Sequence, residues 1–196
     1  TLQHQGETVL IGWLGLPDEA EHPTVAHNWT QMLGLPRSLS WQDGYLLQQP
    51  IAAIRELISG QQQLSYGAGK HSLGGISRSC LLEMELTACG AFQLLLPCGD
   101  ASLSISASQG QWVIERGQLG CANSDKKRVY QSRSENPTKL QLFIDSSSFE
   151  LFVNDGEAVL SGRLFPQQAW GQAQLVLDDG QVALTLSQLR NSWIEE

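Results

Sequence analysis

Four pairs of turn-forming residues, each ending in glycine, divide the chain into short segments of apolar, β-branched and aromatic residues. A polar residue followed by glycine accepts the positive φ angles of a two-residue hairpin turn, so each pair predicts a β-hairpin. The four pairs are Asp43-Gly44, Gln109-Gly110, Asp155-Gly156 and Asp179-Gly180. Hairpins join neighbouring antiparallel strands, and the pattern therefore indicates antiparallel β structure.

Further β-strands are predicted from apolar runs elsewhere, so the chain is expected to be nearly all β. These runs are 8–12, 81–87, 92–96 and 140–145. Within 81–87, Glu83 and Glu85 alternate with Leu82, Met84 and Leu86. Two neighbouring carboxylates are candidates for glycosidic bond cleavage, which needs an acid and a base or nucleophile about 5–10 Å apart. The alternation instead favours an apolar face turned inward and two solvated glutamates.

One segment departs from the β pattern. Ile51, Ile54, Leu57 and Ile58 fall on one face of a predicted short helix, with a proline in the first turn and a glycine just beyond its end. A stretch rich in Gln and Gly follows at 61–69 and is typical of a domain junction.

The chain therefore divides into residues 1–49, a junction at 50–64 and residues 65–196. The last part is long enough for a two-sheet β-sandwich of about ten strands. The first part has room for three or four strands and is too small to bury a core alone. A unit of this kind resembles one blade of a β-propeller without its neighbouring blades.

The charge balance argues against nucleic acid and membrane surfaces as partners. The chain has 12 Lys and Arg against 20 Asp and Glu, a formal net charge of -8, which repels phosphate groups. No apolar run approaches the ~20 residues that span a bilayer, and the first residues lack the pattern of a signal peptide. A soluble protein is expected.

The four cysteines are Cys80, Cys89, Cys98 and Cys121. Two disulfides are arithmetically possible, but a chain of this length does not need them, and we favour buried free thiols in a cytoplasmic protein. No Cys-x2–4-Cys pair exists and the four histidines are scattered singly, so no metal site is expected.

Motifs of several enzyme classes are missing from the sequence: the hydrolase elbow, the His-Glu-x-x-His metal motif, the Walker loop and the dinucleotide fingerprint. The segment 67–72 (GAGKHS) superficially suggests a phosphate loop, but its spacing is wrong and no helical pattern follows it.

Trp13 is the strongest candidate for ligand binding. It lies between two glycines, Gly12 and Gly15, ahead of a proline-containing loop, where small neighbours leave an indole ring accessible. Indole faces stack on sugar rings and bury large areas. The other five tryptophans fit the interior of a β protein equally well.

Two groups of segments together resemble glycoside hydrolase family 32, the invertase and sucrose-6-phosphate hydrolase group. Residues 11–17 (IGWLGLP), 28–29 (NW) and 35–39 (LPRSL) are similar to the last propeller blade of that family. Residues 149–157 (FELFVNDGE) and 163–166 (RLFP) look like a strand-turn-strand signature of its carboxy-terminal β-sandwich. The segments occur in the family's order and cover essentially the whole chain.

The resemblance implies an all-β chain: part of the fifth blade of a five-bladed propeller at 1–49, a linker helix and junction at 50–64, and a sandwich at 65–196. Enzymes of the family cleave β-fructofuranosidic bonds with retention, using acidic residues in Asn-Asp-Pro, Glu-Cys and Arg-Asp-Pro motifs of earlier blades. None of these motifs occurs here, and Asn154-Asp155 is followed by glycine. The resemblance therefore assigns no catalytic residue to this chain.

Two residues can be matched to positions of the family individually. Trp13 corresponds to the aromatic wall near the fructose pocket and is the predicted substrate-binding residue. Arg37 also matches a family position, and we interpret it as a structural contact. The chain alone is expected to be inactive, without metal or cofactor, and to act with the remaining blades on a fructoside.

Alternatives remain open for the sandwich. It is expected to buttress the propeller, and the competing interpretation is a carbohydrate-binding or oligomerisation module. An incomplete blade also leaves unpaired strand edges and apolar surface, which predicts self-association when the chain is handled alone.

Overall fold

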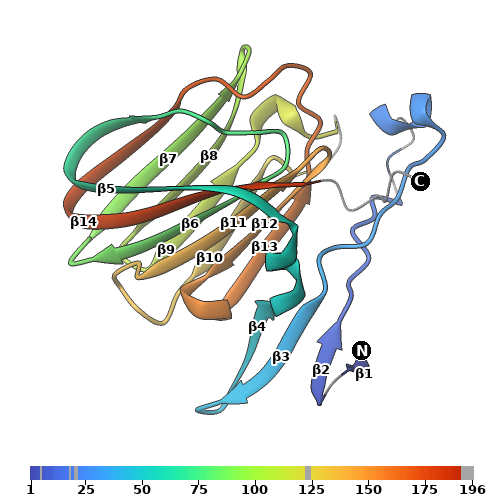
Figure 1. Cartoon of the computed structure of the whole chain (residues 1–196), viewed down its shortest axis with the longest axis horizontal. Helices are drawn as coiled ribbons and strands as arrows, with labels where there is room; N and C mark the ends of the chain where they lie inside the picture. Colours follow the sequence, from blue (N-terminus) through green and yellow to red (C-terminus); the bar gives the residue numbers. More distant parts are fainter. Residues whose placement is uncertain (5, 18, 20–21, 122–124, 191–196) are drawn as a thin grey trace.

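The computed structural model describes residues 1–4, 6–17, 19, 22–121 and 125–190. Its regular structure is almost entirely antiparallel β, as predicted. The chain forms a small amino-terminal sheet and a much larger β-sandwich (Figure 1). In Figure 1 the amino-terminal sheet lies to one side of the sandwich, with a short helix between them.

The amino-terminal sheet has four antiparallel strands in the order β1-β2-β3-β4. These strands are β1 (Leu2–His4), β2 (Glu7–Leu10), β3 (Arg37–Gln42) and β4 (Tyr45–Pro50). The connection from β2 to β3 is long and contains the 3-10 helix η1 (Pro23–His27). Val9 is the one fully buried apolar side chain on these four strands, so the sheet has little core of its own.

The sandwich is built from ten strands that form one continuous, strongly curved sheet in the order β10-β9-β8-β7-β14-β6-β11-β12-β13, with β5 paired to β14. The strands are β5 (Ile58–Leu73), β6 (Cys80–Thr87), β7 (Ala91–Cys98), β8 (Ala101–Ser108), β9 (Gln111–Glu115), β10 (Lys127–Gln131), β11 (Lys139–Asp145), β12 (Ser148–Val153), β13 (Ala158–Arg163) and β14 (Ala173–Leu189). Two further 3-10 helices are η3 (Gly117–Leu119) and η4 (Asn154–Gly156).

The core lies between the two halves of this curved sheet. Side chains that point inward from alternate positions are buried, among them Leu82, Met84, Leu94, Leu103 and Trp112. Period-two burial is what the alternating sequence predicts for strands with one buried face. Glu83 and Glu85 point to the other face of β6, as the alternation predicted.

Three of the four predicted hairpins are present. Asp43 and Gly44 have positive φ angles at the β3–β4 turn, and Gln109 and Gly110 have them at the β8–β9 turn. These are the angles of hairpin turns whose twist matches that of the strands. The third pair, Asp155-Gly156, lies in η4 between β12 and β13.

The fourth predicted hairpin is wrong. Asp179-Gly180 lies inside β14, which runs continuously from Ala173 to Leu189 with a bulge between Leu177 and Gln181. At this bulge the neighbour of β14 changes from β7 to β6, while β5 stays paired on the other side. Glycine is needed here because another part of the backbone lies very close to it. A Cβ on Gly180 would lie 2.5 Å from the carbonyl oxygen of Ala88.

The predicted short helix is present as the 3-10 helix η2 (Ala52–Leu57), with Ile54 buried. The chain then enters β5 directly at Ile58, so the Gln- and Gly-rich residues 61–69 form a strand. Those residues pair with β14 along their length, and backbone pairing rather than apolar alternation holds them there. The loop suggested by residues 67–72 is part of the same strand.

The tryptophans divide between core and surface. Trp112 and Trp170 are buried, as expected of a β core. Trp41 is 73% exposed and Trp29 is 37% exposed, so the core interpretation, one of two left open for them, does not hold. Trp41 lies on the amino-terminal sheet, where no second layer of the described chain covers it. The predicted core residue Trp193 lies outside the described residues.

Candidate functional site around Trp13

Trp13 is held in a short two-stranded pairing that extends the amino-terminal sheet. It forms an isolated antiparallel bridge with Leu33. The Leu14 amide donates to the carbonyl oxygen of Met32 at 2.9 Å, and the Gly34 amide donates to that of Gly12 at 2.8 Å. We call residues 30–35 the return segment, because they run back along the Trp13 strand and complete its pairing.

The indole of Trp13 is 61% exposed and lies over the backbone of Gly15. A Cβ at position 15 would lie 2.6 Å from the indole Nε1 and closer still to the ring carbons. The ring is therefore accessible and lies against a small residue, as the sequence predicted. An exposed indole fixed over a glycine offers one face for stacking against an apolar or sugar surface.

The second residue matched in the sequence, Arg37, lies at the boundary between the two sheets. Its Nη2 donates to Glu150 Oε2 at 2.5 Å and to Ser161 Oγ at 2.7 Å, and Nη1 donates to Gln48 Oε1 at 3.0 Å. The guanidinium also stands 5.6 Å from the ring centre of Phe152. These contacts join β3 to β12 and β13, which fits a structural contact rather than a ligand-binding group.

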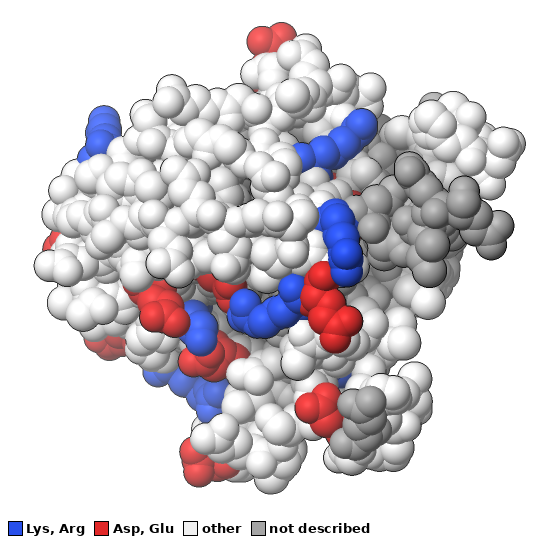
Figure 2. All heavy atoms as spheres, in the orientation of Figure 1, with Lys and Arg blue, Asp and Glu red and all other residues white. Residues whose placement is uncertain are grey.

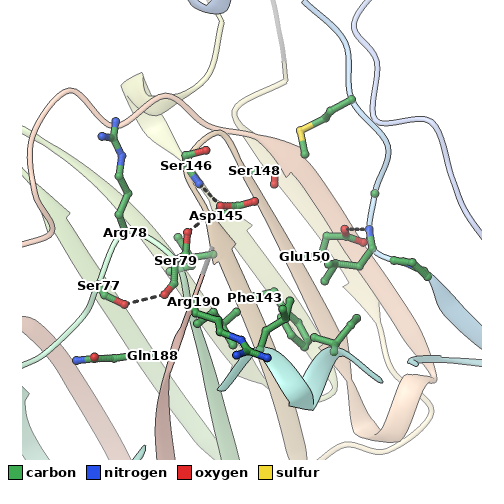
Figure 3. Close-up of a pocket in the computed structure, with 18 of the residues that line it drawn as sticks. Ser77, Arg78, Ser79, Phe143, Asp145, Ser146, Ser148, Glu150, Gln188 and Arg190 are labelled. Atoms are coloured by element: carbon green, nitrogen blue, oxygen red, sulfur yellow. Dashed lines mark hydrogen bonds between the residues drawn. The ribbon is translucent and has the colours of Figure 1, made fainter. Parts of the chain in front are cut away.

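Glu150 is the charged centre of this junction. It is a charged residue that is only 3% exposed, and its neighbours on β12 are apolar and also buried. Besides Arg37, its Oε1 accepts the backbone amide of Leu35 at 2.5 Å. Figure 3 shows this carboxylate turned toward the end of the return segment.

Arg163 forms a second buried contact between the two parts. It is 1% exposed, its Nε donates to the carbonyl oxygen of Ser147 at 3.0 Å, and its Nη1 donates to that of Thr30 at 2.9 Å. Its guanidinium contacts the rings of Trp29 and Phe165, with its central carbon 5.2 and 5.1 Å from their centres. Burial lowers the pKa of Arg163 from its usual value, because the charged form is poorly solvated there.

A groove of about 730 Å³ lies where the return segment meets the sandwich. One wall is apolar and includes Leu35, Ile54 and Phe143, and the other carries hydroxyl and charged groups. Figure 3 shows the polar side, where Asp145 accepts hydrogen bonds from Ser79 Oγ and from the Ser146 amide. Trp13 is not among the residues that line this groove.

A second, shallower hollow lies on the outer face of the sandwich and contains the glutamates that the sequence singled out. Figure 2 shows charged side chains of both signs gathered on this side of the molecule. Glu83 Oε1 forms an ion pair with Arg55 Nη2 at 2.7 Å and accepts a hydrogen bond from Gln141 Nε2 at 2.8 Å. Lys139 Nζ lies 4.0 Å from Glu85 Oε1. Burial acts to raise the pKa of Glu83, but these donors outweigh it and keep the pKa below 4.5. An ionised, paired carboxylate of this kind suits a structural role.

Sequence reasoning assigned no role to Glu150 or Arg163, although both lie in the segments that carry the family resemblance. The available signal was a charged residue inside an unbroken apolar run, as in 149–153 (FELFV). A charge at such a position is expected to be buried and therefore paired.

Among the described residues, no group of three or more His, Cys, Asp or Glu side chains could hold a metal ion. The four cysteines form no disulfide among the described residues, and all four are buried. No helix in the described part of the chain is long and apolar enough to cross a membrane.

Comparison with known proteins gives two family matches that together cover nearly the whole chain. The family described as "Glycosyl hydrolases family 32 C terminal" matches residues 53–191, and "Glycosyl hydrolases family 32 N-terminal domain" matches residues 1–50. The sucrose-6-phosphate hydrolase of Vibrio alginolyticus is 31% identical over 168 residues, which are 84% of this chain and 33% of that protein.

Solved structures show the same arrangement. The sucrose-6-phosphate hydrolase of Lactobacillus gasseri superposes with a TM-score of 0.80 and 26% identity, covering 94% of this chain and 39% of that one. A Bombyx mori family 32 β-fructofuranosidase has a TM-score of 0.76 at 21% identity, which supports the fold, and covers 97% of this chain and 40% of that one. This chain therefore spans between a third and two fifths of the length of these relatives.

Proposed function

Because this chain belongs to glycosyl hydrolase family 32, we propose that it is the carboxy-terminal part of a retaining β-fructofuranosidase that acts on sucrose, sucrose 6-phosphate or a related β-fructoside. The observation that carries the proposal is the presence of both family domains in one chain, with only 50 residues of the amino-terminal one. The substrate class is taken from the related sucrose-6-phosphate hydrolases.

In this proposal residues 1–49 are part of the fifth propeller blade, 50–64 are the linker and junction, and 65–196 are the sandwich. The strands β1–β4 form one antiparallel sheet, the kind of unit that makes up propeller blades. Strand β5 begins at Ile58, so the proposed junction 50–64 and the start of this strand overlap.

Exposed apolar residues on the amino-terminal sheet support a missing neighbour. Leu2, Trp41, Tyr45 and Leu46 are each about half exposed or more. Adjacent blades would bury such side chains, and the hydrophobic gain would be about 25 cal/mol for each Å² removed from water. The proposed partners are therefore the remaining blades of the parent enzyme, and self-association through the same surface is expected when they are absent.

Trp13 is proposed as the substrate-contacting residue of this chain. No residue of the chain is assigned a catalytic role. The ring is exposed and held over Gly15, and it can stack against a furanose ring bound by the other blades. The acidic residues that break the glycosidic bond would come from those blades.

A cytoplasmic location is proposed for the same enzyme. Four buried cysteines that form no disulfide among the described residues fit a reducing compartment. Burial raises the pKa of Cys80 to about 12, so this thiol stays protonated and unreactive at neutral pH.

The test is release of glucose from sucrose and sucrose 6-phosphate. The chain is assayed alone and after co-expression with the segment encoded directly upstream. Inactivity alone and hydrolysis by the combined protein would support the proposal. Hydrolysis by this chain alone would contradict it and direct attention to Glu83 and Glu85.

A second candidate function is carbohydrate binding or oligomerisation by the sandwich. The groove beside Asp145 favours it, because hydroxyl, carboxylate and guanidinium groups line one wall and an apolar surface lines the other. Calorimetric titration of the full chain with sucrose and inulin distinguishes the two functions. Saturable binding that survives Trp13→Ala and is lost in Asp145→Ala would favour the binding module.

A further inference from the structure

The return segment, which pairs with the Trp13 strand, is held at both ends by charged side chains of the sandwich. At its start, the carbonyl oxygen of Thr30 accepts from Arg163 at 2.9 Å. At its end, the Leu35 amide donates to Glu150 at 2.5 Å (Figure 3). Ser147 Oγ adds a weaker contact to the sulfur of Met32 at 3.7 Å.

The two charged groups are rigidly placed with respect to each other. Glu150 and Arg163 lie on β12 and β13, which pair with each other so that Ser148 faces Arg163 and Ser161 faces Glu150. Both side chains are more than nine-tenths buried, and each has several fixed partners. A buried charge loses much of its hydration and is held firmly by the partners that replace water.

The return segment carries this rigidity to Trp13. Between its two fixed ends, Met32 and Gly34 make the backbone hydrogen bonds to Leu14 and Gly12, on either side of Trp13. No other backbone pairing of the described chain flanks this indole, since Trp13 lies outside the named strands.

We propose that Glu150 and Arg163 are positioning residues that set the location of the Trp13 indole through the return segment. The inference rests on the proposed function, in which Trp13 is a wall of the fructoside site. The sandwich then contributes to the shape of the substrate site without touching the substrate. A loss of either hydrogen bond to the return segment shifts Trp13 while the catalytic groups on the other blades stay in place.

The first experiment measures local order in the chain itself. Hydrogen exchange at the amides of Leu14 and Gly34 is followed by NMR in Glu150→Gln and Arg163→Lys. Gln keeps the size of Glu150 but exchanges an acceptor oxygen for a donor. Lys keeps the charge of Arg163 but has one donor nitrogen in place of the separate Nε and Nη1 that bond Ser147 and Thr30. Because loss of a hydrogen bond to a charged group costs about 1.5–3 kcal/mol, exchange at these amides is expected to be at least about tenfold faster.

Two control variants separate positioning from general stability. Leu103→Ala removes buried core volume in β8 and lowers global stability. Arg55→Met breaks the ion pair between the linker helix and Glu83 of the sandwich, away from the return segment. Both are expected to leave exchange at Leu14 and Gly34 unchanged under strongly native conditions. Equal acceleration in Leu103→Ala, or no acceleration in either test variant, would overturn the inference.

Gly34→Ala provides a milder variant with all charges retained. A Cβ at this position would lie 3.2 Å from Glu150 Oε1, so the carboxylate must shift by a few tenths of an ångström. Faster exchange at Leu14 is expected here too. An unchanged rate at Leu14 in this variant, together with an unfolded Glu150→Gln, would count against the carboxylate as a positioning group.

The second experiment uses the combined enzyme of the preceding subsection. Glu150→Gln and Arg163→Lys are expected to raise KM for sucrose more than they lower kcat, and to have no further effect on KM once Trp13 is replaced by Ala. Additive effects of the two changes would contradict action through Trp13. If the combined protein is inactive, the proposed function fails, while the exchange measurement still decides whether the two residues position Trp13.

Discussion

The indole of Trp13 occupies the space that a side chain at position 15 would fill. Gly15→Ala is therefore expected to turn the exposed ring away from the backbone while leaving the fold intact, because neither group is part of the core. The indole N–H resonance of Trp13, assigned by its loss in Trp13→Phe, should move in Gly15→Ala. Gly12→Ala is the matched control, since a Cβ there meets nothing within 4 Å. An unmoved resonance in Gly15→Ala would contradict the contact.

The ion pair between Arg37 and Glu150 is expected to contribute strongly to stability. Arg37→Met leaves a carboxylate that is 3% exposed without its cation, and the free energy of unfolding should fall by about 3 kcal/mol. The comparison is Arg128→Met, which breaks an exposed pair with Asp125 and should cost less than about 1 kcal/mol. Urea unfolding measures both, and equal losses would show that burial of Glu150 adds nothing.

Glu157 is expected to make stability depend on pH at the acid end. Burial acts to raise its pKa, but hydrogen bonds from the Arg133 amide, Tyr130, Asn154 and Ser132 lower it below the usual 4.5. A carboxylate with a lowered folded-state pKa stabilises the protein above its unfolded pKa, and this contribution disappears as the pH falls through the folded pKa.

The check for this prediction is the melting temperature between pH 3 and 7 for the parent chain and Glu157→Gln. The variant should be less stable at pH 7 and should lose less stability on acidification. Parallel pH profiles would rule out a contribution from this carboxylate.

Tyr130 is expected to make the stability of the protein depend on pH at the alkaline end. Burial and the hydrogen bond to Glu157 raise its pKa to about 12 from the usual 10. A raised pKa favours the neutral phenol in the folded state, so the contribution is complete below pH 10 and is lost between about pH 10 and 12. Tyr130→Phe should flatten this part of the stability profile, measured by urea unfolding at pH 8, 10 and 11.

The bulge of β14 is expected to require glycine. Gly180 has a φ of +74°, and a Cβ there would lie 2.5 Å from the carbonyl oxygen of Ala88. Backbone strain alone costs about 1–3 kcal/mol, and the overlap adds to it, so Gly180→Ala should be strongly destabilising. Gly67→Ala is the control, because Gly67 pairs with the same bulge and has open space around it. Similar melting temperatures for the two variants would contradict the need for glycine at the bulge.

Local sequence patterns were sufficient to predict most strands and three hairpins, because the alternation of a strand and the geometry of a turn depend on only a few neighbouring residues. They failed at Asp179-Gly180, where the same dipeptide serves a bulge in a continuous strand. A glycine with positive φ is needed in both cases, and only the partners on either side distinguish them. Those partners, β5, β6 and β7, lie about 80 or more residues earlier in the chain.

The candidate site shows the same division. The accessibility of Trp13 follows from its small neighbours, and Arg37 was placed correctly as a structural contact. The roles of Glu150 and Arg163 required the fold, because their partners Leu35 and Thr30 are more than 100 residues away. The exposure of Trp41 was missed for a related reason. Trp41 lies in a β-strand, where a tryptophan is commonly a core residue. Its exposure becomes visible only in the structure, because no layer of the described chain covers it.

The central position of β14 also has a consequence for the order of folding. This strand pairs with β5, β6 and β7 and comes after every other strand of the sandwich in the sequence. While the chain is being synthesised, those strands emerge with their pairing edges and apolar faces unprotected. The sandwich can close only after Leu189 has left the ribosome. Its folding is therefore late and cooperative, and contacts between residues far apart in sequence make such closure slow.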